Sequence, residues 1–183
     1  VDEEPEDGNG KAYREQWITN TEVPGTASLN LSLSNFDDVP NYAVQSFDGA
    51  VTLEDVFISY PSNLDGFQDT NLGYAGIAAD GGSLNTTRVT IDTPQSYGIY
   101  GENGAALTIK ETSITSAIYT GNSGFLFEAD GVGILAKEGT SLSMESNLII
   151  GCGVAGVQIE NGSLQGYNDV IQSGFSGLLF ESS

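Results

Sequence analysis

The sequence predicts an all-β solenoid of about six coils, with a repeat of roughly 22 residues. Three observations support this prediction: an apolar phrase at a regular spacing, strand-like alternation within each copy, and a turn signal after it. The first apolar positions of the six copies are Leu29, Val51, Leu84, Leu107, Leu142 and Leu164. The steps between them are 22, 33, 23, 35 and 22 residues. Such repeats bury their apolar faces only against neighbouring copies.

Two further apolar positions recur in each copy. Seven residues after the first position stand Phe36, Ile58, Ile91, Ile114, Ile149 and Ile171. The first copy then closes on Ala43-Val44. The other five close on a glycine-aliphatic pair: Gly76-Ile77, Gly98-Ile99, Gly133-Ile134, Gly156-Val157 and Gly177-Leu178. We predict three short strands in each coil, with three inward ladders of apolar side chains.

A turn signal follows the glycine-aliphatic strands. The pairs are Asp48-Gly49, Asp80-Gly81, Asn103-Gly104, Glu138-Gly139 and Asn161-Gly162. Glycine permits positive φ there, and such pairs often mark two-residue hairpins. A constant phase over six copies instead favours parallel strands, stacked coil upon coil at about 4.8 Å.

The two long steps predict outward loops. About 11 or 12 extra residues intervene between Ile58 and Gly76, and again between Ile114 and Gly133. Because the register is intact on either side, both insertions leave the coil at the same corner. Insertions of this kind often carry function.

Three regions are expected along the chain. Residues 1–10 hold five acids in their first seven positions, which predicts a disordered acidic tether. Residues 11–26 include Trp17 and are expected to form an N-terminal cap or partial coil. Residues 27–183 form the solenoid, which we expect to continue in a parent protein because the last copy has no polar cap.

Composition excludes several classes of function. The chain has 25 acidic and five basic residues, so we expect no binding to nucleic acid or to anionic membranes. No apolar run is long enough for membrane insertion. Without histidine the chain cannot form a Ser-His-Asp triad or a His-ligated zinc site, and Cys152 alone cannot form an internal disulfide.

The repeat resembles that of right-handed parallel β-helix proteins, the pectate-lyase-like superfamily. The resemblance rests on residues 76–91, from Gly-Ile-Ala-Ala-Asp to Arg-Val-Thr-Ile, and on residues 161–171. It covers about residues 27–183 and implies a right-handed parallel β-helix. An asparagine often lines the bend between the second and third strands of such proteins. Asn147 and Asn168 stand near that phase here, with Asp55, Arg88 and Glu111 in other coils.

The resemblance implies no single activity, because the superfamily includes lyases, hydrolases, adhesins and scaffolds. Its pectate lyases carry basic catalytic residues beside calcium-binding aspartates, and we find no such cluster here. Its polygalacturonase-like members need a histidine. Its pectinesterase-like members pair aspartates with an arginine, and Arg88 stands at a bend with no evident partner. No catalytic residue of the superfamily is carried over to this chain.

One outward row of the third strand is the candidate ligand surface. By strand alternation its members are Phe47, Asp80, Glu102, Lys137, Glu160 and Glu181. Stacked carboxylates could form an acid-base pair or bind a cation such as calcium, although the sequence contains no calcium-loop consensus. Alternatively the row is a solvated turn in which Lys137 relieves repulsion between Glu102 and Glu160.

Aromatic residues gather near the same corner. The candidates beside the row are Tyr97, Tyr100 and Tyr119. Their rings could stack on sugars, or they could pack the loops onto the coil. We expect no bound cofactor, with calcium the one cation to consider.

The leading hypothesis for function is a non-enzymatic β-helix that is secreted or displayed at the cell surface. It would act as a scaffold, stalk or adhesion module, and its partners would be further coils, a second copy joined end to end, or a polysaccharide. The alternative is a non-catalytic or truncated part of a polysaccharide-active lyase or hydrolase. The absence of the known catalytic sets favours the first.

Overall fold

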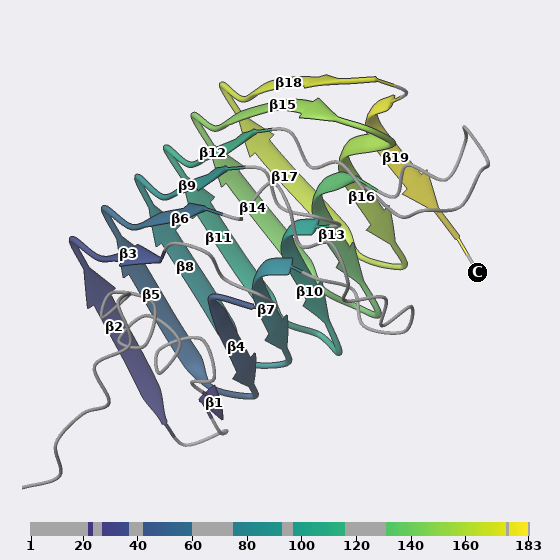
Figure 1. Ribbon diagram of the computed structural model, residues 1–183. Helices are drawn as coiled ribbons and strands as arrows, with labels where there is room; N and C mark the ends of the chain where they lie inside the picture. The colour runs from purple at the N-terminus through teal and green to yellow at the C-terminus, as the bar shows by residue number, and fades with distance from the viewer. Residues whose placement is uncertain are drawn as a thin grey trace, which may run out of the picture.

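The computed structural model describes residues 22–23, 27–36, 42–59, 75–92, 97–115, 131–174 and 176–182. All secondary structure in these ranges is strand, in three sheets that run side by side along one axis (Figure 1). Every pair of neighbouring strands is parallel, as the repeat predicts, so the Asp-Gly and Asn-Gly pairs do not form hairpins. The expected tether, 1–10, lies outside the described residues, and so does most of 11–26.

Each coil contributes one strand to each sheet. Sheet A contains seven strands: β1 (Glu22–Val23), β4 (Val44–Phe47), β7 (Ala75–Asp80), β10 (Tyr97–Glu102), β13 (Val132–Lys137), β16 (Ala155–Glu160) and β19 (Ser176–Glu181). Sheet B contains six: β2 (Ser28–Ser32), β5 (Ala50–Glu54), β8 (Ser83–Thr87), β11 (Ala106–Lys110), β14 (Ser141–Glu145) and β17 (Ser163–Tyr167). Sheet C contains six: β3 (Asn35–Phe36), β6 (Phe57–Ser59), β9 (Thr90–Asp92), β12 (Ser113–Thr115), β15 (Leu148–Cys152) and β18 (Val170–Ser173).

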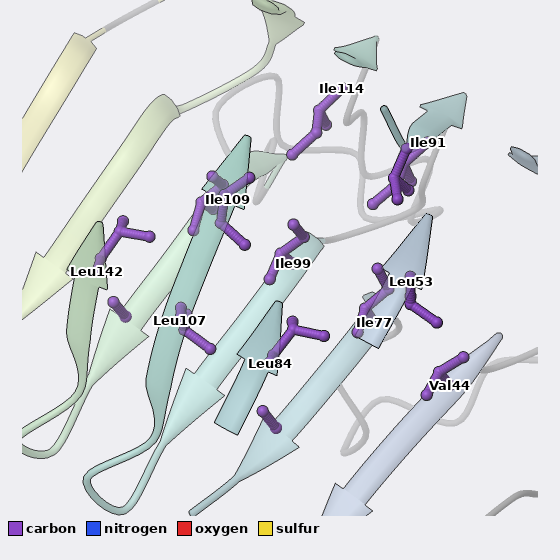
Figure 2. Packing of buried hydrophobic residues seen from close by; sticks show 14 of the residues in the cluster. Val44, Leu53, Ile77, Leu84, Ile91, Ile99, Leu107, Ile109, Ile114 and Leu142 are labelled. Atoms are coloured by element: carbon purple, nitrogen blue, oxygen red, sulfur yellow. The ribbon is translucent and has the colours of Figure 1, made fainter. Parts of the chain in front are cut away.

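The three predicted ladders form the core. Cross-strand register places Leu84 beside Leu107, Ile91 beside Ile114, and Ile77 beside Ile99. Side chains from all three sheets meet between them and are almost completely buried (Figure 2). Each coil therefore buries its apolar side chains between its three strands, and this core is continuous from coil to coil along the axis.

The bends between sheets B and C use the left-handed backbone region. One non-glycine residue per coil has positive φ there, between 47° and 58°: Leu33, Asp55, Arg88, Glu111, Ser146 and Asn168. The amide of Arg88 donates to the carbonyl of Lys110 in the next coil, at 3.1 Å, and the amide of Glu111 donates to Glu145 at 2.9 Å. These main-chain bonds offset the cost of the conformation, so asparagine is not required at this position.

Asn147 has a different position from Asn168. It follows the left-handed residue Ser146, and its side chain is buried. Its Oδ1 accepts from the amide of Thr112 at 2.9 Å, and its Nδ2 donates to the carbonyl of Ile109 and to Asp169. Asn147 thus joins three consecutive coils, a role that the sequence pattern did not reveal.

The two inserted stretches fall at equivalent places in the coil. One lies between β6 and β7 and the other between β12 and β13, and in both cases the strands on either side are in register. The predicted common corner is therefore consistent with the flanking strands. The inserted residues 60–74 and 116–130, Tyr119 among them, lie outside the described residues.

Candidate functional site

The candidate row lies on the outer face of sheet A, along the ends of its strands. Register pairs Phe47 with Asp80 and Asp80 with Glu102, and farther along it pairs Lys137 with Glu160 and Glu160 with Glu181. The row therefore has the order that strand alternation predicts. Alternate positions of the same strands carry the core residues Ile99 and Ile134, so the row faces away from the core.

Glu102 is the centre of the row. Its Oε2 accepts a hydrogen bond from the hydroxyl of Tyr100 at 2.7 Å and lies 3.2 Å from Nζ of Lys137. The Lys137 ammonium is 5.1 Å from the centroid of the Tyr100 ring, within the range of a cation-π contact. Both charged side chains are about three-quarters shielded, with exposures of 26% for Lys137 and 24% for Glu102. These three groups form one connected polar cluster.

Two pKa values in this cluster are raised. Burial raises the pKa of the Tyr100 phenol, and the adjacent Glu102 carboxylate adds to the effect. The adjacent Tyr100 phenol raises the pKa of the Lys137 ammonium, and Glu102 acts in the same direction. Both groups therefore keep their protons at neutral pH.

The other acids of the row accept hydrogen bonds from neutral amides, and Gln158 donates to both Glu160 and Glu181. Asn103 Nδ2 donates to Asp80 at 2.7 Å, and Gln158 Nε2 donates to Glu160 at 2.8 Å. The predicted relief of charge by Lys137 is thus seen at Glu102, whereas a neutral amide contacts Glu160. The acids of the row are thus held in small local networks.

An apolar cluster beside the row was missed by the sequence reasoning. Val132, Leu135 and Ala155 lie on the outer face of sheet A yet are at most 5% exposed, and Tyr97, Tyr100, Val154 and Leu179 pack against them. The rings of Tyr97 and Tyr100 are 5.6 Å apart at a tilt of 49°. The cluster holds Tyr100 in position above Lys137. Its one sequence signal was the run of apolar residues from Val132 to Ala136.

Arg88 was expected to have no partner, and that expectation is wrong. Its guanidinium binds both carboxylate oxygens of Asp55, at 2.6 and 2.9 Å, and also contacts Glu54 at 2.5 Å. This pairing lowers the pKa of Asp55 and raises that of Arg88. Asp55 and Arg88 occupy the same bend position in successive coils, which explains their proximity. The ion pair joins two coils on an exposed edge.

Three further features are the cysteine, metal-binding groups and membrane-spanning helices. Cys152 is buried, and its Sγ lies 4.0 Å from the carbonyl oxygen of Ile150. Among the described residues, no group of three or more cysteine, aspartate or glutamate side chains is arranged to hold a metal ion. In the same part of the chain there is no helix with the length and hydropathy that crossing a membrane requires.

The three stacked parallel sheets define a class of protein, the parallel β-helix solenoids. The chain belongs to the right-handed β-helix family, because the model of the "right handed beta helix region" matches residues 22–183. The match confirms the predicted fold class and its hand. No curated protein and no solved structure matches this sequence.

The raised pKa values predict a loss of stability in alkali. A phenol whose pKa is higher in the folded state than its ordinary 10.0 stabilises the folded state fully below pH 10.0. This stabilisation is lost as the pH rises through the folded-state pKa. Lys137, whose ordinary pKa is 10.5, likewise loses its stabilising effect as the pH rises above that value. We expect Tyr100→Phe to flatten the fall in the free energy of unfolding between about pH 9 and 12.

Denaturant unfolding at a series of pH values measures this effect. Tyr167→Phe, at a side chain that is 74% exposed, is the matched control and should leave the fall as in the wild type. Identical profiles for the two variants would contradict the role assigned to the Tyr100 cluster.

Proposed function

We propose that this domain is a non-enzymatic scaffold or adhesion module of a secreted or cell-surface protein. The observation that carries the proposal is the Tyr100–Glu102–Lys137 cluster, in which the polar groups of the candidate ligand surface are bound to one another. A cluster of this kind holds the outer face of the coil in one arrangement. It fits a structural surface better than a reaction centre.

The direction of the pKa shifts supports this view. A catalytic lysine needs a lowered pKa so that its neutral amine is available near pH 7, and a general acid or base works best with a pKa near the working pH. The pKa values of Lys137 and Tyr100 both move upward, away from neutrality. Neither group is thereby prepared for proton transfer.

The strong negative charge limits the partners of this domain. A formal charge of −20 favours solubility and disfavours anionic partners. Partners joined through strand pairing are part of the proposal: β17, β18 and β19 are edge strands of their sheets in the structure, and Phe180 on β19 is 61% exposed. Further coils or a second copy would cover such edges.

A screen for turnover tests the proposal. Neutral and acidic polysaccharides are incubated with the wild-type domain, with Glu102→Gln and with the control Glu145→Gln, whose carboxylate contacts Lys110 on sheet B at 2.8 Å. We expect no release of reducing ends or of unsaturated products above the no-protein blank. Turnover that Glu102→Gln abolishes and Glu145→Gln retains would overturn the proposal in favour of an enzyme acting on polysaccharides.

A further inference from the structure

Two bends between sheets A and B contain an asparagine that is followed by glycine. The chain has three such pairs, and the first, Asn9-Gly10, lies outside the described residues. The other two are Asn103-Gly104 and Asn161-Gly162. Both asparagines are exposed and have a left-handed backbone, with φ of 52° and 53°. The two bends therefore allow a comparison between identical residue pairs in one fold.

An asparagine that precedes glycine can convert without an enzyme. The nitrogen of the following amide gives up its proton to hydroxide and attacks the side-chain Cγ. The Cγ–Nδ2 bond breaks, and ammonia leaves after it takes a proton from water. Water then opens the resulting succinimide ring at one of its two carbonyls, which gives either aspartate or isoaspartate. Glycine favours the attack because it has no side chain and its backbone turns freely.

At Asn103 both reacting groups are bound. The side-chain Nδ2 donates to Oδ1 of Asp80 at 2.7 Å, and the amide of Gly104 donates to the carbonyl oxygen of Glu138 at 2.9 Å. The amide must leave Glu138 and the side chain must leave Asp80 before the nitrogen can reach Cγ. Both hydrogen bonds therefore oppose the reaction.

At Asn161 the attacking amide is available. Among the described residues, no hydrogen-bond acceptor is within reach of the amide of Gly162, and Gly162 is only half-buried. Hydroxide can therefore take the proton of this amide without the loss of a hydrogen bond. The main chain of Asn161 is bound to both neighbouring coils: its amide donates to Glu181 at 3.2 Å, and its carbonyl oxygen accepts from Gly139 at 2.8 Å. A change in this main chain is consequently felt in three coils.

We propose that Asn161-Gly162 is a site of spontaneous deamidation, and that the isoaspartate product releases the strand that follows it. Isoaspartate adds one atom to the main chain between β16 and β17. The added atom shifts β17 against β14, where Leu164 now pairs with Leu142. The product also places a new carboxylate next to Glu160, in a chain that already has 25 acidic residues. Water is the one co-reactant, so the proposal is independent of the role proposed above.

Peptide mapping of the aged domain tests the proposal. The folded domain is incubated in mildly alkaline buffer and digested at acidic pH, and the peptides that contain Asn103 and Asn161 are followed by mass spectrometry. We expect Asn161 to convert about tenfold faster than Asn103, the effect of two hydrogen bonds on the opening of a bend. In urea the two should convert at similar rates. Equal rates in the folded domain, or faster conversion at Asn103, would overturn the proposal.

A variant and an exchange measurement test the consequence. Asn161→Gly keeps a residue that accepts positive φ but removes the reacting side chain, so its β17 should stay as protected after ageing as before. In the wild type, the isoaspartate fraction should exchange its β17 amide hydrogens faster than fresh protein does, whereas β8 should be unchanged. Unchanged exchange in β17, or equal ageing of the Asn161→Gly variant, would overturn the release of the strand.

Discussion

Gly133→Ala is expected to destabilise the solenoid by about 1–3 kcal/mol, because the added methyl group has no room. A Cβ at this position would lie 2.5 Å from the carbonyl oxygen of Gly156 and 2.5 Å from Cγ2 of Ile149, with Sγ of Cys152 at 3.1 Å. The first contact is with main chain that is fixed by pairing of β13 with β16. The second is with a fully buried ladder residue, so neither neighbour can move away without disturbing the next coil.

Gly177→Ala is the matched control for this effect. Gly177 occupies the same position of the repeat on β19, but the nearest atoms to its Cβ would lie 3.8 and 4.0 Å away. Ordinary contact distances predict a neutral or slightly stabilising change, since alanine restricts the unfolded chain more than glycine does. Denaturant unfolding followed by far-UV circular dichroism compares the two variants. A loss of equal size at both positions would show that backbone freedom, not space, explains the glycine row.

The fold was predictable because three separate ladders of apolar residues indicate the same arrangement. The ladders that contain Leu107, Ile114 and Ile99 each keep their phase across insertions, and a parallel stack is the arrangement that satisfies all three together. The glycine-aliphatic pair was informative for the same reason. Gly98 has no space for a side chain between its own coil and the next, because a Cβ there would lie 2.6 Å from the carbonyl oxygen of Gly133.

Side-chain pairing at the bends was not predictable in the same way. Sequence reasoning placed Arg88 correctly at a bend but gave it no partner, although Asp55 stands 33 residues earlier at the equivalent position. An insertion separates the two residues in sequence, and only the bend geometry brings them together. The left-handed conformation was also unforeseen at Arg88 and Glu111, because main-chain bonds between coils support it irrespective of residue type.

The candidate site shows a further limit of strand alternation. Alternation correctly gives the direction in which Leu135 points, but direction does not determine exposure. Leu135 faces away from the core and is only 5% exposed. The polar contacts of Tyr100 with Glu102 and Lys137 likewise follow from tertiary placement and from side-chain length. The sequence therefore indicated which residues share a face, and the structure was needed to show which of them are bound together.

The second large effect is expected at Asn147, the buried amide that joins three coils. Asn147→Asp keeps the volume of the side chain but replaces its N–H donors with an oxygen. That oxygen would face the carbonyl of Ile109, now 2.9 Å from Nδ2, and the carboxylate of Asp169, now 2.8 Å away. We expect a loss of about 2–4 kcal/mol at neutral pH, because buried acceptors would oppose each other without a proton between them.

The pH dependence of this loss identifies its cause. Burial and the Asp169 carboxylate would raise the folded-state pKa of the introduced carboxyl above its unfolded value of about 3.9, so the folded state would favour the protonated form. The penalty should therefore be small below about pH 4 and grow as the pH rises through the folded-state pKa. Asn168→Asp is the control: this neighbour is exposed and donates one bond, to Ser146 Oγ at 3.2 Å. Urea unfolding of both variants from acid to neutral pH should show a large, pH-dependent loss for Asn147→Asp alone. A pH-independent loss, or equal losses at the two positions, would show that the buried amide does not join the coils as described.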